Sequence, residues 1–234
     1  MSKLTICIKP QEFNESLIEI MEPSVYKPKA SNIKITTSDI LYRNNDGKLC
    51  NLYIALPSVE AYGPSPIYNF NSKMKTKENI QGYSISYSHS DVEKMFESLM
   101  KTCQDKINEF AKSKLIKKCI LKPTFNYKNN SEDKTKVAYF KLNTIRDSES
   151  DVVKILTKMS STSNEPLNLI DTVSKYGLLT PMIHISKIYF GPHGNSEYGA
   201  SIQIKVVRLR FSQKTTSVPD FPSSDEEEQD EEYN

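Results

Sequence analysis

The sequence predicts an α+β fold in which a curved, antiparallel β-rich sheet is covered by one long amphipathic helix. Several short segments alternate apolar and polar residues and are bounded by turn-forming residues, a pattern typical of strands. A single longer stretch after Ser90 places its apolar residues at helical spacing instead. With 234 residues, of which 37% are hydrophobic, the chain is long enough to bury a sizeable core.

The first hairpin is predicted from two alternating segments joined by a turn. Ile33–Ile40 and Leu49–Leu56 alternate, and the connecting RNNDGK carries an Asp46-Gly47 pair, which favours a tight turn. A proline-rich loop follows, and Gly82–Ser88 then resumes the alternating pattern as another strand.

The helix is predicted from Asp91 to about Lys117. Ser90 is followed three residues later by Glu93, the spacing of a capping box, and lysines crowd the last turns, where cations suit the helix dipole. The apolar face that should dock on the sheet consists of Val92, Phe96, Leu99, Cys103, Ile107, Phe110 and Leu115.

A second hairpin is expected from the strand-like segments Cys119–Tyr127 and Lys136–Asn143, which flank a polar loop. Between Asp147 and Ser163 the stretch DVVKILTKM shows a short helical pattern, and Pro166–Tyr176 predicts another short helix.

The last hairpin has the clearest pattern. TPMIHISKIYF and ASIQIKVVRLRF both alternate around the turn-forming GPHGNSEYG. Past Val206 the apolar side shifts to Val207, Leu209 and Phe211, which predicts a β-bulge or an exchange of faces. His193 lies between glycines near Glu197, so this loop is also a candidate catalytic loop, although Gly-Pro and Gly-Asn pairs favour a plain turn.

The C-terminal segment DFPSSDEEEQDEEYN differs in charge from the rest of the chain. Eight of the 29 acidic residues lie between Asp220 and Glu232, so Met1–Pro219 carries about ten more cations than acids, although the whole chain has a formal charge of only +2. Such a run of like charge cannot bury apolar area. We therefore expect one globular domain over residues 1–219 and a disordered acidic tail over 220–234.

Several classes of function lack a sequence signature here. The sequence has no phosphate-binding G-x-x-x-x-G-K-[ST] loop, no G-x-G-x-x-G, no H-E-x-x-H and no G-x-S-x-G. The four cysteines and three histidines do not have zinc-ligand spacing. No secretory signal or membrane-spanning run is apparent. We therefore expect an intracellular protein that is not an enzyme, has no cofactor or metal, and has no membrane partner.

Cations interleaved with aromatic residues on the predicted strands are the remaining chemical signal. Single-stranded nucleic acid exposes base faces and phosphates together, and aromatic rings and cations bind these two groups. In-and-out alternation means that about half of the aromatic residues must face the core. The candidate stacking residues are Tyr127, Tyr139, Phe140 and Tyr189, and the candidate phosphate-binding residues are Lys122, Lys128, Lys136, Lys141, Lys205, Arg208 and Arg210.

The acidic tail has three interpretations. It can fold back on a cationic surface and compete with nucleic acid at high effective concentration. It can instead recruit partner proteins, with Phe221 and Tyr233 as apolar anchors, or it can act only as a solubilising segment.

Two parts of the sequence, NLYIALPSVEAYGPSPIYNF and HISKIYFGPHGNSEYGASIQIKVVRLRF, together with the acidic C-terminus, resemble the single-stranded DNA-binding proteins of nucleocytoplasmic large DNA viruses, including those of poxviruses and asfarviruses. The resemblance is strongest over Leu52–Phe70 and His184–Phe211, about a fifth of the chain. It implies an OB-like barrel, sequence-tolerant coating of single-stranded DNA in viral replication or recombination, self-association on DNA, and a tail that contacts replication proteins. It also implies a location in the host cytoplasm, at the site of viral replication, or in the nucleus.

Two other functions stay open at this level. A viral structural or scaffold protein would use a tyrosine-rich sheet for protein contacts and would show no salt-dependent DNA binding. A nuclease would need a metal-binding carboxylate cluster, for which the sequence gives no pattern.

Overall fold

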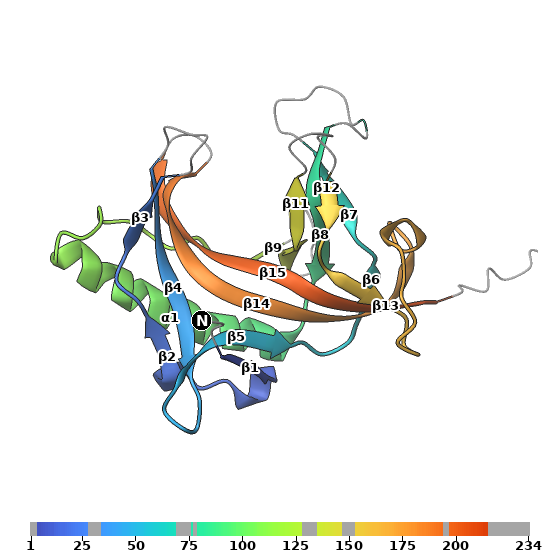
Figure 1. Ribbon diagram of the computed structural model, residues 1–234, viewed down its shortest axis with the longest axis horizontal. Coiled ribbons are helices and arrows are strands. Elements are labelled where there is room, and N and C mark those ends of the chain that lie inside the picture. The colour runs from blue at the N-terminus through green and yellow to red at the C-terminus, as the bar shows by residue number, and fades with distance from the viewer. Residues whose placement is uncertain are drawn as a thin grey trace, which may run out of the picture.

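The computed structural model describes residues 4–27, 34–68, 76, 79–127, 135–146, 153–193 and 197–214 (Figure 1). The expected acidic tail and Lys128 lie outside these residues. The helices are the α-helix α1 (Ser90–Lys112) and the short 3-10 helices η1 (Pro10–Glu12), η2 (Glu15–Leu17) and η4 (Leu169–Asp171). The strands are β1 (Thr5–Ile8), β2 (Ile18–Ile20), β3 (Ser24–Tyr26), β4 (Ile35–Arg43), β5 (Leu49–Ala55), β6 (Val59–Tyr62), β7 (Ser65–Tyr68), β8 (Ile80–Tyr87), β9 (Phe125–Tyr127), β10 (Lys136–Leu142), β11 (Thr144–Arg146), β12 (Val153–Ile155), β13 (Lys158–Ser160), β14 (Tyr176–His193) and β15 (Glu197–Gln213).

Among the described residues, thirteen strands form one sheet in the order β1-β5-β4-β14-β15-β10-β8-β7, with β2, β3, β6, β9 and β13 paired beside this path. The long β14–β15 pair curves through the middle of the molecule (Figure 1). Strands β4, β5 and β14 each pair with the other two, so this part of the sheet curls in an OB-like manner. The predicted α+β class, rich in antiparallel pairs and with one long helix, is confirmed, although β1–β5, β10–β15 and β13–β15 are parallel.

Helix α1 buries the apolar face that its spacing predicts. Six of the seven expected residues are buried in the core, namely Val92, Phe96, Leu99, Cys103, Ile107 and Phe110. Phe96 packs against Phe125 and Phe140 of the sheet, with ring centroids 5.7 and 5.8 Å away. The seventh residue, Leu115, is exposed because the helix has already ended.

Both ends of α1 differ from the prediction. The helix ends at Lys112, five residues before the predicted end at Lys117, because Lys114 adopts a left-handed conformation with φ of 59° that cannot continue a helix. At the other end Ser90 is already helical, so the predicted capping box is wrong. His89 caps the helix instead, and its Nδ1 accepts a hydrogen bond from the backbone N–H of Asp91 at 3.3 Å.

The three predicted hairpins are present as β4–β5, β9–β10 and β14–β15. Gly47 supplies the positive φ, 75°, that the first turn needs. The GPHGNSEYG segment is a hairpin connection, since His193 pairs with Glu197; residues 194–196 lie outside the described residues.

The two predicted short helices are wrong. The DVVKILTKM segment forms strands β12 and β13, because Met159 is buried while Lys158 and Ser160 are more exposed, an alternation of period two. The stretch from Pro166 to Tyr176 contains only the 3-10 turn η4.

The predicted bulge is confirmed and has a defined position. Met182 pairs with Arg208, but the next residue, Ile183, pairs with Val206, so Val207 is the extra residue of β15. Val206 and Leu209 are fully buried. Two consecutive residues, Val207 and Arg208, therefore lie on the face turned away from the core.

A buried threonine holds β15 beside this bulge. The Thr157 hydroxyl donates to the carbonyl of Val206 at 2.5 Å and accepts from the backbone N–H of Asn143 at 2.8 Å. Replacing Thr157 by Val keeps the shape and removes the hydroxyl, while the backbone N–H of Asn143 still donates to the carbonyl of Val206 at 3.1 Å. Because both groups keep one partner, we expect Thr157→Val to lower the free energy of unfolding by about 0.5 to 1.5 kcal/mol in urea denaturation. A loss of less than about half a kcal/mol would mean that the direct hydrogen bond between Asn143 and Val206 is sufficient without the hydroxyl.

Candidate nucleic-acid interface

The face of the sheet turned away from the core, called here the outer face, carries a row of polar side chains. Tyr53 on β5 pairs with His184 on β14, His184 with Lys205 on β15, Lys205 with Lys141 on β10, and Lys141 with Ser84 on β8. Each member of the row follows or precedes a buried residue on its own strand, which places the row on the outer face.

Strand β15 contributes two cations that each face a cation on a neighbouring strand. Lys205 is the direct partner of Lys141, and Arg208 is the direct partner of Lys158 on β13. All four residues are exposed, and within the part of the chain that the structure describes none of them forms an ion pair. Like charges placed opposite each other destabilise a sheet. This cost is typical of a surface that binds an anionic partner.

An aromatic stack lies at the end of this cationic row. The rings of Tyr53 and His184 are 4.5 Å apart and nearly parallel, with an angle of 9° between them. Burial, and then the nearby charge of Lys205, lower the pKa of His184 below its ordinary value near 6.5. The imidazole is therefore neutral at pH 7, and the stack presents an uncharged aromatic surface beside the cations.

The lowered pKa of His184 predicts a loss of stability in mild acid. As the pH falls below about 7, the unfolded chain binds a proton on this imidazole before the folded chain does, so the free energy of unfolding decreases until the folded pKa is passed. We expect His184→Phe, which keeps a ring on Tyr53, to remove this decrease, by up to about 1.4 kcal/mol per pH unit. Urea denaturation of both proteins between pH 7.5 and 5 measures it, and parallel curves would contradict it.

Five of the residues singled out in the sequence lie on the outer face near this site. Lys141, Lys205, Arg208 and Arg210 are exposed, and Tyr139 is 65% exposed, two residues before Lys141 on the same side of β10. The structure thus brings four predicted phosphate-binding residues and one predicted stacking residue onto one face.

Phe140 is a wrong prediction as a stacking residue. Its side chain is 1% exposed and belongs to an aromatic cluster with Tyr87, Phe96 and Phe125, at centroid distances of 5.7, 5.8 and 6.2 Å. The physical reason is strand alternation, since Phe140 faces α1 when Tyr139 faces outward.

Lys136 and Tyr127 lie toward α1 and not on the outer face. The Lys136 ammonium contacts the carboxylates of Glu93 and Glu97 on α1, at 2.5 and 3.0 Å, and lies 5.6 Å from the centre of the Tyr127 ring. Hydrogen bonds that the ammonium donates to these two carboxylates raise the pKa of Lys136. Because the carboxylates of α1 already neutralise this charge, Lys136 does not belong to the cationic row of the outer face.

The two other described candidates are separated from the cationic row. Lys122 is exposed beside Ala200, whose carbonyl accepts its backbone N–H at 2.8 Å. Tyr189 is half-buried, with its ring against Gly191: a Cβ added there would come within 2.5 Å of the tyrosine hydroxyl.

Three residues of the site were missed in the sequence. Tyr53 lies between the buried Leu52 and Ile54, and His184 lies between two buried isoleucines. The alternation of a strand therefore places both side chains on an outer face. Lys158 was hidden by the incorrect helical interpretation of its segment. No local signal brings these residues together, because the strand pairing that joins them connects distant parts of the chain.

Among the described residues, no group of three or more His, Cys, Asp or Glu side chains is placed to hold a metal ion. The same part of the chain contains no helix that combines the length and the apolar character needed to cross a bilayer.

No family model matches the chain, and no curated protein matches it. A solved structure to which it is similar is the crystal structure of gp2.5, a single-stranded DNA binding protein encoded by bacteriophage T7, with a TM-score of 0.40 and 12% sequence identity over 70% of this chain and 95% of that chain. A similarity this low does not by itself assign a function to this chain.

Proposed function

We propose that this chain binds single-stranded DNA along its outer face without sequence preference. The observation that carries the proposal is the set of two facing cation pairs, Lys205 with Lys141 and Arg208 with Lys158, beside the stacked rings of Tyr53 and His184. A single strand exposes both phosphates and base faces, so it matches both halves of this surface, whereas duplex DNA hides its base faces.

The cations and the rings have separate roles in this proposal. Lys141, Lys158, Lys205 and Arg208 contact phosphates, and each contact made with a single strand adds about 0.7 to the dependence of log affinity on log salt. Arg210 extends this set along β15. Tyr53 with His184, and Tyr139 on β10, provide stacking surfaces, each contributing about 1 to 3 kcal/mol per base.

We further infer a role in viral DNA replication or recombination, with self-association on DNA and with contacts to replication proteins through the acidic tail. The resemblance of Leu52–Phe70 and His184–Phe211 to the viral single-stranded DNA-binding proteins supports this inference. Strand β15 carries Arg208 and Arg210 a few residues before Lys214, where the described chain ends, so the acidic segment follows two cations of the outer face closely in the sequence. This position supports competition between the tail and DNA.

Fluorescence anisotropy of a labelled oligo-dT tests the proposed function. We expect binding at low salt that weakens steeply as salt rises, equal affinity for mixed-sequence single strands, and much weaker binding to duplex. Absence of binding at low salt would reject the proposal and favour a structural protein that makes protein contacts. Binding that requires a divalent cation would favour a nuclease.

A chain ending at Pro219 should bind oligo-dT more tightly than the full chain. Removing eight carboxylates that compete for the outer face raises affinity, and we expect about a tenfold gain at low salt that disappears at high salt. The same anisotropy titration measures this gain. Equal affinities at every salt concentration would leave partner recruitment or solubility as the role of the tail.

A further inference from the structure

The bulge in β15 creates one wall of a pocket on the outer face. Because Val207 is the extra residue between Val206 and Arg208, its side chain and that of Arg208 follow one another on the same side of the strand. A regular strand would turn one of the two into the core. Bulges often occur where a strand redirects a side chain toward a binding site.

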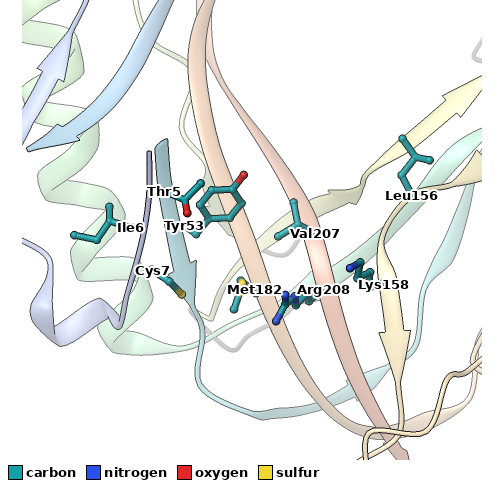
Figure 2. Close-up of a pocket in the computed structure, with 9 residues that line it drawn as sticks. All are labelled: Thr5, Ile6, Cys7, Tyr53, Leu156, Lys158, Met182, Val207 and Arg208. Atoms are coloured by element: carbon teal, nitrogen blue, oxygen red, sulfur yellow. The ribbon is translucent and has the colours of Figure 1, made fainter. Parts of the chain in front are cut away.

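The pocket has a volume of about 470 Å³ and lies where β1, β5, β14 and β15 face β13 and the short connection between β12 and β13. Figure 2 shows its lining along the β14–β15 pair, with Lys158 beside Arg208. The residues that line it are Thr5, Ile6, Cys7, Tyr53, Leu156, Lys158, Met182, Val207 and Arg208.

The lining combines an apolar interior with a cationic rim. Tyr53, Met182 and Val207 supply an aromatic ring, a polarisable thioether and a branched aliphatic group, all of which suit the face of a flat heterocycle. Arg208 and Lys158 supply two cations that have no carboxylate partner among the described residues. A ligand for this pocket therefore needs a planar apolar part and an adjacent anionic group.

His184 limits how such a ligand can stack. Its ring covers one face of the Tyr53 ring, with the two centroids 4.5 Å apart. A ring that enters from the pocket therefore stacks on the remaining surface of Tyr53 and extends the aromatic stack. The pocket is within the range of about 300 to 1,000 Å³ that is typical of small-ligand sites.

We propose that this pocket takes one nucleobase of the bound strand, with the base against Tyr53, Met182 and Val207 and its phosphate between Arg208 and Lys158. This inference rests on the proposed function and adds to it a fixed position where one base is withdrawn from its neighbours. The rest of the outer face then contacts the strand through phosphates and open stacking.

Filling the pocket tests the proposal, because a larger side chain excludes the base from the pocket and leaves the phosphate contacts in place. The variant Val207→Trp adds a large side chain without changing charge, at a position that is not in the core. The probes are labelled dT12 and a 12-mer of the same length made of abasic sugar phosphates. We expect Val207→Trp to weaken dT12 binding about tenfold and to leave binding of the abasic 12-mer unchanged.

Two matched comparisons complete the experiment. Val25→Trp, at a residue that is 65% exposed on β3, should change neither affinity. If Val207→Trp lowers the affinity for both oligomers equally, or for neither, the proposal of a base pocket is overturned while the proposed function stands. If wild-type protein binds neither oligomer at low salt, the proposed function fails and the pocket assignment fails with it.

The reactivity of Cys7, which lines the pocket, can be measured without mutating the pocket. All four cysteines lie within the described residues, and Cys7 is exposed while Cys50, Cys103 and Cys119 are buried. Partial burial raises the pKa of the Cys7 thiol, so alkylation by N-ethylmaleimide should be followed at pH 8 or above. We expect saturating dT12 to slow this alkylation at least fivefold more than the saturating abasic 12-mer does; equal protection would overturn the proposal.

Discussion

Replacing Lys141, Lys158, Lys205 and Arg208 together by Gln should reduce affinity for oligo-dT several hundredfold at 0.1 M salt. Losing four phosphate contacts makes the slope of log affinity against log salt less steep by about 3. At 0.1 M salt, a change of this size in the slope corresponds to a loss of affinity of several hundredfold. Anisotropy titrations at four or more salt concentrations give both quantities.

The same variant should be more stable than the wild type. Each facing pair, Lys205 with Lys141 and Arg208 with Lys158, places like charges opposite one another, and removing the repulsion contributes about 0.2 to 1 kcal/mol per pair. Weaker binding with a higher melting temperature is the combination that distinguishes a binding surface from a structural one.

The matched control changes four exposed lysines elsewhere, Lys94, Lys101, Lys112 and Lys118, to Gln. It removes the same net charge from α1 and the segment that follows it. We expect a much smaller change in affinity and in salt slope. If both fourfold variants lose affinity equally, net charge and not the outer face controls binding.

Adjacent substitutions on β10 should have opposite effects. Phe140→Ala removes a ring that contacts three other aromatic residues in the core and should lower the free energy of unfolding by about 3 to 5 kcal/mol. Tyr139→Ala removes an exposed ring and should change stability by less than about 1 kcal/mol, while weakening oligo-dT binding about 5- to 100-fold.

Urea denaturation measures the first of these effects and anisotropy measures the second, on protein shown by circular dichroism to be folded. Tyr139→Phe is the control, since it retains the stacking surface and should bind nearly as the wild type does. A Tyr139→Ala protein with unchanged affinity would remove β10 from the stacking surface and leave Tyr53 with His184 as the site of base contact.

Local periodicity was sufficient to predict the helix face, the three hairpins and the bulge after Val206. Each of these features is encoded in the spacing of residues that are close in sequence. The segment that forms β12 and β13 was misread because each of these strands has only three residues, too few for a strand period to be distinguished from a helical one.

The site itself was predictable only in part. Cations on β15 were found because they alternate with buried residues on one strand. Their partners Lys141 and Lys158 come from two strands that run parallel to β15, and such pairing requires long connections with no turn signal to indicate it. Alternation also separates Tyr139 from Phe140, but only the docking of α1 decides which of the two is buried.

Strand β14 pairs with β4, β5, β6 and β15, so one late segment of the chain completes most of the sheet. During synthesis the earlier strands leave the ribosome long before Tyr176–His193 exists, and the edges that pair with β14 lack this partner until then. Folding of the sheet is therefore completed late in synthesis, and we expect a chain that ends before Tyr176 to leave the β14-facing edges of β4, β5 and β6 exposed.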